Sequence, residues 1–107
     1  MVIQEINQFR ISANVLTLEP LRYTPAGVPA LNLQLGHHSQ ISEASQTRQV
    51  DLVLKAVALG AVAERLIKLE IGSKAWFLGF LATPHGTKRL LFHIQEFTKE
   101  QSLSPLN

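Results

Sequence analysis

Five basic side chains and one tyrosine are the residues of this 107-residue chain whose type and placement could do chemistry. Cations that follow an extended polyanion neutralise its phosphates, and an exposed aromatic ring offers a surface on which a nucleobase stacks. The basic residues gather in three segments instead of spreading evenly along the chain. These segments hold Arg22 beside Tyr23, then Arg48 and Lys55, then Lys88 and Arg89 with His85 nearby.

The overall charge does not by itself select a partner. Ten basic and eight acidic side chains give a formal charge of +2, which is weak support for a polyanionic ligand. The chain has no cysteine, which excludes disulfides and thiolate metal sites. The first residues turn polar at once, and no apolar run approaches the ~20 residues that span a bilayer. We therefore expect a cytoplasmic protein without a membrane contact.

Catalysis and metal binding find little support in the sequence. Asp51, the serines and four histidines are present, but there is no nucleophile elbow, no glycine-rich phosphate loop and no pair of spaced carboxylates. His37 and His38 adjoin each other, yet no spacing supplies the further ligands that a metal ion needs. His93 alternates outward between apolar residues, which favours a structural or surface role. We expect no enzyme activity, no cofactor and no metal.

The elements that must position the basic segments follow from hydrophobic periodicity. Residues 6–18 alternate as a half-buried strand, with Phe9, Ile11, Ala13 and Val15 on its inner face. The proline-rich stretch 20–29 then reverses the chain, where Ala26-Gly27 suits a turn that needs a positive φ and Pro25 fixes the φ before it. Residues 30–38 form the clearest strand, with Leu31, Leu33 and Leu35 inward.

The rest of the chain adds two strands after one helix. Residues 39–47 are polar and unpatterned, which predicts a mobile loop. A third strand over 48–57 would place Val50, Leu52, Leu54 and Ala56 inside. A helix over 59–69 has an apolar stripe of Leu59, Val62, Ala63, Leu66 and Leu69. Strands over 74–82 and 89–97 follow, joined by the short loop 83–88.

Three strands, one helix and two strands are the order of an OB-fold. We expect an all-β domain, a five-stranded barrel whose one helix between strands 3 and 4 closes an end, over residues 1–98. Residues 99–107 would be a disordered tail. In an OB-fold the loops between strands 1–2 and 4–5 and the face of strands 2–3 surround one groove that commonly holds oligonucleotides. The three basic segments fall at these places.

Two aromatic positions have alternative interpretations. Tyr23 could stack on a base, or it could pack over the mouth of the barrel while the neighbouring cations only solubilise the protein. On the fourth strand, Trp76, Leu78 and Phe80 share an outer face. Three large apolar side chains in a row favour an oligomer interface or local packing over base stacking.

Several motifs together carry a resemblance to a known family. They are the run from Glu19 to Pro29, the Leu-x-Leu-x-Leu strand that ends at His37-His38-Ser39, Arg48-Gln49, Ile71-Gly72-Ser73-Lys74, Gly79-Phe80-Leu81 and Leu91-x-His93-x-Gln95. In this combination, over residues 7–97, the chain resembles the primosomal replication protein N (PriB) family. The run from Glu19 is shared in looser form with bacterial single-stranded-DNA-binding proteins.

The resemblance implies a homodimer of OB-folds that binds single-stranded DNA without sequence preference. It further implies a role in replication restart through contact with the PriA helicase, with a DnaT-like primosomal protein as a further candidate partner. The site residues carried over by the resemblance are Arg22, Tyr23, His38, Arg48, Lys88 and Arg89. Lys55 and His85 join them because of their places in the fold, and Trp76, Leu78 and Phe80 form the expected interface.

Two features depart from the family pattern. Members can carry an aromatic on the DNA-facing side of the third strand, whereas this chain has Asp51 there, and the loop before Lys88 is short with few lysines. Fewer cations release fewer counterions, so we expect modest DNA affinity. Two alternatives stay open. One is a general single-stranded-DNA-binding protein, which typically continues into a long acidic-tipped tail where this chain stops at Asn107. The other is an OB-fold adaptor that binds protein and scarcely touches DNA.

Overall fold

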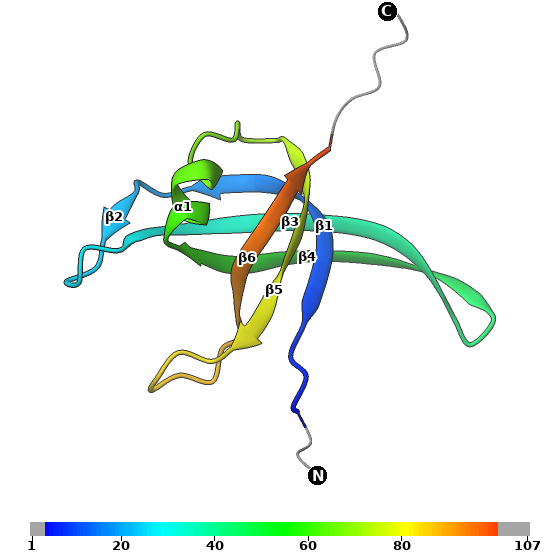
Figure 1. Ribbon diagram of the computed structural model, residues 1–107. Helices are drawn as coiled ribbons and strands as arrows, with labels where there is room; N and C mark the ends of the chain where they lie inside the picture. The colour runs from blue at the N-terminus through cyan, green and yellow to red at the C-terminus, as the bar shows by residue number, and fades with distance from the viewer. Residues whose placement is uncertain (1–3, 101–107) are drawn as a thin grey trace, which may run out of the picture.

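The computed structural model describes residues 4–100, which form one small barrel with a projecting hairpin (Figure 1). Six strands and one helix follow each other along the chain. They are β1 (Phe9–Leu18), β2 (Arg22–Tyr23), β3 (Pro29–Glu43), β4 (Gln46–Leu59), α1 (Ala61–Leu66), β5 (Lys74–Ala82) and β6 (Leu91–Lys99).

Strand β1 closes the barrel because it pairs with two neighbours in turn. Its first half, Phe9 to Asn14, pairs with β5, and its second half, Asn14 to Leu18, pairs with β3. The hydrogen-bonded ring therefore runs β1-β5-β6-β4-β3 and returns to β1, with only β4 and β6 parallel. This ring with a single helix after β4 confirms the predicted five-stranded OB-fold barrel. The two-residue strand β2 is an addition at the edge of β3.

The core consists of the inward side chains of all five ring strands. Fully buried leucine, valine and phenylalanine side chains fill it, and α1 covers one end with Ala63 and Leu66. The guanidinium of Arg65 lies 4.7 Å from the centre of the Phe97 ring, which fixes the helix over that end. The predicted inner faces of the strands are confirmed for Ala13, Val15, Leu31, Leu33, Leu35, Ala56, Phe77, Phe92 and Ile94.

The mobile loop predicted over 39–47 is wrong. Strands β3 and β4 pair without interruption out to Glu43 and Gln46, and a two-residue turn at Ala44 and Ser45 joins them with φ of 52° and 64°. Positive φ at both residues is typical of the type I′ turn, whose twist matches that of paired strands. Serine, threonine and glutamine are compatible with such a ribbon because its backbone hydrogen bonds do not require a buried face.

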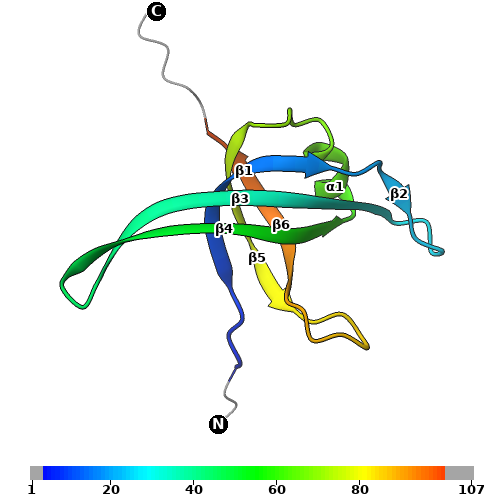
Figure 2. The same cartoon turned by 180° about the vertical axis from the view of Figure 1, so that it is seen from behind.

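The outer part of this hairpin, residues 37–52, is called the arm below. It extends away from the barrel on the side opposite to β2 in both views (Figures 1 and 2). The prediction that Leu52 points into the core is wrong, because it lies on the arm beyond the barrel and is exposed. The helix is also shorter than predicted. Leu59 ends β4 with an exposed side chain, and turns replace the helix after Leu66.

The carboxyl end of the described chain is held against β5. The Glu100 amide donates a hydrogen bond to the Lys74 carbonyl at 3.0 Å, and the side chains of these residues form an ion pair at 3.7 Å. Residues 101–107 of the expected tail lie outside the described residues, so the division of the chain at residue 98 stays a prediction. Among residues 4–100, no helix is long and apolar enough to cross a membrane.

Gly79 marks the closest approach of two strands in the barrel. The register of β5 against β6 shifts between Leu78 and Gly79, and a Cβ built on Gly79 would lie 1.7 Å from the His93 carbonyl oxygen. Because that oxygen belongs to the backbone of the neighbouring strand, no side-chain movement can make room. Glycine is therefore required at this bulge.

We predict that Gly79→Ala lowers the free energy of unfolding by about 3 kcal/mol or more, the upper end of what overpacking costs. Gly86→Ala is the matched control. Its Cβ would meet nothing within 4 Å, so the only cost is a positive φ of 82°, about 1 kcal/mol. Urea unfolding followed by circular dichroism compares the two, and equal losses would contradict this account.

Candidate nucleic-acid interface

One face of the paired strands β3 and β4 looks away from the core and carries most of the predicted ligands. Directly opposed residues alternate between the two sides, so the pairs Leu33 with Ala56 and Leu35 with Leu54 face inward. The pairs between them lie on the other side of the two strands, which we call the outer face. These are Asn32 with Val57, Gln34 with Lys55, Gly36 with Val53, and His38 with Asp51, of which Val57 is buried by its neighbours.

Arg22 joins the outer face through β2. It lies opposite Ala30 on β3, and its Nη2 donates a 3.0 Å hydrogen bond to Oδ1 of Asn32. This bond holds an exposed guanidinium one pair away from Lys55 along β3 and β4. The structure thus brings two of the predicted cations, Arg22 and Lys55, to the same surface.

The proline-rich reversal that carries Arg22 is a hydrogen-bonded turn. The Gly27 amide donates to the Thr24 carbonyl at 2.8 Å, and the Thr24 amide donates to the Val28 carbonyl at 2.9 Å. Gly27 adopts φ of 84°, as the sequence predicts. Tyr23 lies opposite Pro29, on the other side of the β2–β3 pair from Arg22, and 61% of its surface is exposed. Its ring is therefore accessible to a ligand, but it is not on the outer face.

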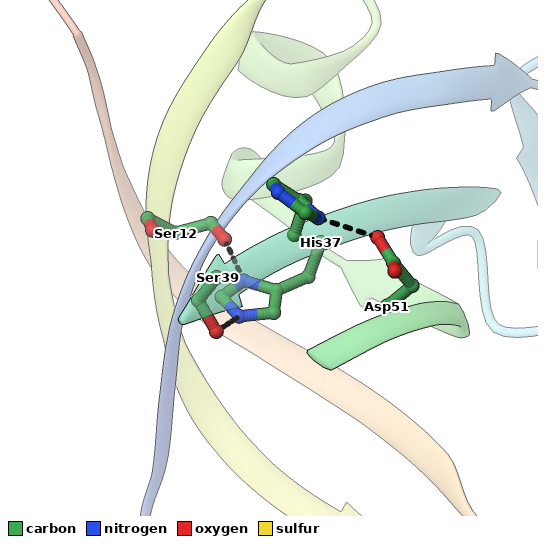
Figure 3. A network of polar contacts seen from close by, with 5 residues as sticks. Ser12, His37, Ser39 and Asp51 are labelled. Carbon is green, nitrogen blue, oxygen red and sulfur yellow. Dashed lines mark hydrogen bonds and ion pairs between the residues drawn. The ribbon is translucent and has the colours of Figure 1, made fainter. Parts of the chain in front are cut away.

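His37 and His38 have different partners because successive residues of β3 point to opposite sides of the strand. Figure 3 shows His37 beside Ser12 and Ser39. His37 is half-buried between the arm and the barrel, and its Nδ1 donates to the Ser12 carbonyl at 2.7 Å. Since Nδ1 carries the proton, Nε2 of the neutral ring accepts from the Ser39 hydroxyl at 2.8 Å. These two bonds connect the base of the arm to β1.

His38 lies on the outer face and pairs with Asp51. The distance between Nδ1 of His38 and Oδ1 of Asp51 is 2.6 Å, and their side chains are 62% and 71% exposed. The anion that the sequence predicts on the outward side of this strand is therefore present, with a histidine beside it. An exposed ion pair of this kind contributes less than about 1 kcal/mol to stability.

Arg48 is not brought to the outer face. It lies opposite Ile41 on the other side of the arm, where its Nε pairs with Oε1 of Glu43 at 2.5 Å. Arg48 was predicted as a ligand because it opens the third strand, and that position does not determine which face of the strand its side chain occupies.

The loop between β5 and β6 presents the remaining predicted cations. His85, Lys88 and Arg89 are all exposed on residues 83–90. The amide and hydroxyl of Thr87 both donate to the Pro84 carbonyl at 3.1 Å, which fixes a tight turn around Gly86. This loop and the Arg22 reversal lie on the same side of the barrel, away from the arm tip (Figures 1 and 2).

Trp76 lies on a separate surface formed by β1, β5 and β6. It is 59% exposed and borders a hollow of about 580 Å³ that Arg10, Leu78, Glu96 and Thr98 also line. Phe80, the third member of the expected interface, is instead half-buried and stacks on His93 with ring centres 4.7 Å apart.

Sequence reasoning missed one member of the outer face. Leu16 falls at the β1 bulge between Val15 and Thr17, and its side chain lies beside Gly36. Alternation from the buried Val15 already places this leucine on the outward side, so the pattern in 6–18 was the signal that could have found it. Within residues 4–100, no cluster of three histidine or carboxylate side chains could hold a metal ion.

Comparison with known proteins gives consistent matches over nearly the whole chain. A model described as "Another single-strand binding protein family" matches residues 7–96. Replication restart protein PriB of Bordetella pertussis is 39% identical over 92 residues, which cover 85% of this chain and 86% of that protein. Replication restart protein PriB of Nitrosomonas europaea is 32% identical over 91 residues, 84% of either chain.

Solved structures similar to this chain include a PriB protein and a single-stranded DNA binding protein. PriB from Ralstonia solanacearum has a TM-score of 0.84 at 36% identity and covers 91% of this chain and 100% of that chain. The single-stranded DNA binding protein from Thermus aquaticus has a TM-score of 0.69 at 24% identity and covers 92% of this chain and 52% of that one. At that identity the second likeness concerns the fold alone.

We predict that His37→Leu loosens the arm while leaving the barrel intact. Loss of both hydrogen bonds should cost about 1–2 kcal/mol and speed amide hydrogen exchange over residues 38–50 much more than over 31–35. His38→Leu, at the exposed neighbouring position, should leave both segments unchanged. Uniform acceleration in His37→Leu would mean that these bonds do not hold the arm in place.

Proposed function

This chain belongs to the PriB family of single-strand-binding OB-fold proteins, and from that premise we propose that it binds single-stranded DNA as a non-catalytic accessory protein of replication restart. The observation that carries the proposal is the convergence of Arg22 and Lys55 on the outer face of β3 and β4. A further pair of cations, Lys88 and Arg89, stands on an exposed loop.

In the proposed mode of binding, the cations contact the phosphates of the DNA backbone, and the bases contact the protein surface between the cations. Arg22 and Lys55 contact phosphates over the barrel, and Lys88 and Arg89 contact them at the loop. Tyr23 offers a ring for stacking at the end of the strand path, and His38 and His85 add polar contacts. With four phosphate contacts, the slope of log K against log salt is about −3, which is shallow for a DNA-binding protein.

Asp51 makes a protein-binding adaptor the second candidate function. Its carboxylate lies on the outer face and opposes phosphates, so DNA affinity is held down. Because the chain belongs to the PriB family, we propose that its protein partners are the PriA helicase and, where one exists, a DnaT-like primosomal protein. Titration of fluorescent oligo-dT at low and physiological salt separates the two candidates. No binding at either would leave only the adaptor.

We also propose that the protein is a homodimer in which Trp76 and Leu78 are covered. Support comes from the exposed indole beside the hollow on β1, β5 and β6, which is a large apolar group for a monomer to leave in water. Arg10 and Glu96 lie on either side of Leu78. A two-fold axis along β5 would bring each arginine over the glutamate of the other copy.

Single cation removals test the DNA contacts. We predict that Arg22→Ala, Lys55→Ala and the double variant Lys88→Ala/Arg89→Ala each weaken oligo-dT binding. Each lost phosphate contact should reduce the salt slope by about 0.7. Fluorescence anisotropy between about 50 and 200 mM salt measures affinity and slope together.

Lys68→Ala, an exposed cation just after α1, is the matched control and should change neither quantity. Arg48→Ala should have little effect, because its guanidinium is paired with Glu43 on the other side of the arm. A larger loss in Arg48→Ala than in Lys55→Ala would place the DNA on that other side.

Trp76→Arg tests the dimer. We predict a shift from dimer to monomer in sedimentation velocity, because each copy would then bring an uncompensated cation to the two-fold axis where the two indoles were buried. Tyr23→Arg, an equally exposed aromatic on β2, should remain dimeric. A dimer that survives Trp76→Arg would show that the copies associate elsewhere.

A further inference from the structure

A shallow hollow of about 490 Å³ lies on the outer face where the arm leaves the barrel. Leu16, Gly36 and Val53 line its apolar part, and His38 and Asp51 line its polar part. We call it the Gly36 hollow. Of its lining, the DNA contacts proposed above use only the polar side chain of His38.

The apolar part depends on the absence of a side chain at Gly36. A Cβ there would lie 3.0 Å from Cδ2 of Leu16, so the leucine side chain occupies the space beside the glycine. Val53, directly opposite Gly36, is 65% exposed although it is aliphatic. Together the two side chains form a ledge that offers apolar contact to a flat ring.

The polar part presents a directed acceptor. His38 and Asp51 form the next outward pair after Gly36 and Val53, about 7 Å further along the strands. The bond to His38 uses Oδ1 of the carboxylate, which leaves Oδ2 as a second acceptor on a side chain that is 71% exposed. An acceptor about one ring width from the ledge is placed to meet the edge of a base lying on it.

Lys55 lies beyond the lining of the hollow, on the side of Gly36 and Val53 away from Asp51. It belongs to the outward pair before Gly36 and Val53, again about 7 Å along the strands. A nucleotide whose phosphate pairs with Lys55 would therefore lay its base over Gly36 and direct its edge toward Asp51. Lys55, the apolar ledge and Asp51 therefore follow each other in the same order as the phosphate, the ring and the outer edge of one nucleotide.

We propose that the Gly36 hollow is a base-reading subsite that selects cytosine over thymine, an inference that rests on the proposed single-stranded-DNA binding. The N4 amino group of cytosine donates a hydrogen bond to the Asp51 carboxylate. Thymine presents its O4 acceptor at the same position, where it meets a carboxylate that can only accept. Asp51 is thus the specificity-determining residue. Its charge repels the phosphates of any strand, and for cytosine the hydrogen bond from N4 offsets that repulsion.

The experiment compares oligo-dC and oligo-dT of equal length, about 15 nucleotides, within the site size of one or two OB folds. Both are pyrimidine strands, so differences in stacking area are small. Fluorescence anisotropy with the full-length protein should give a dissociation constant about three- to tenfold lower for oligo-dC, the range of an ordinary hydrogen bond, because the Asp51 carboxylate is exposed to water.

Asp51→Asn separates base reading from plain repulsion. The amide can turn either its oxygen or its nitrogen toward the base, so it accepts from cytosine N4 or donates to thymine O4. Both oligonucleotides should bind more tightly once the charge is gone, and the preference should fall to about one. Glu43→Gln removes a carboxylate from the other side of the arm and should leave the preference unchanged.

The outcomes distinguish a failure of the base-reading subsite from a failure of the proposed DNA binding. Equal affinities of the wild-type protein for the two strands, or a preference for oligo-dT, would overturn the base-reading subsite while leaving the proposed function in place. A cytosine preference that persists in Asp51→Asn would also overturn it, because another group would then be the reader. Failure of both strands to bind at low salt would overturn the proposed function and this inference together.

Discussion

The double pairing of β1 is the constraint on which the rest of the structure depends. One strand pairs with β5 from Phe9 to Asn14 and with β3 from Asn14 to Leu18, and a bulge lies between Val15 and Thr17. Beyond Gly36, β3 has no further pairing with β1 in the sheet, and it continues with β4 as the arm. The side chain of Leu16, at the bulge, lies beside Gly36. Barrel closure, the start of the arm and the hollow are thus all found where β1 changes its partner.

The outer face is built from paired positions and carries little net charge. Arg22 is held by Asn32, Lys55 stands opposite Gln34, and Asp51 is held by His38. A surface of this kind attracts a polyanion weakly, so shape and directed hydrogen bonds count for more in its selectivity than in a strongly basic groove. In the proposed binding mode, a few cations therefore hold the phosphates, and the carboxylate among them discriminates between bases.

The sequence was sufficient for the fold but only partly for the site. Alternation in β1, β3 and β5 identified the core positions, since leucines and valines at every second residue have one way to be buried. Residues 39–47 could not be assigned by the same means, because a ribbon exposed on both sides has no apolar pattern. Arg22 and Lys55 were placed correctly by their elements. The face that Arg48 occupies depends on the register of the arm, which composition does not encode.

The central claim is that single-stranded DNA lies across the outer face of β3 and β4, and chemical-shift mapping tests it most directly. A ¹⁵N-labelled sample titrated with oligo-dT should show its largest amide shifts at Arg22, Lys55 and Val53 and in the loop 83–90. The amides around Trp76 should change little, because that surface is assigned to a second copy of the chain. Shifts confined to Trp76, Leu78 and Glu96 would contradict the account.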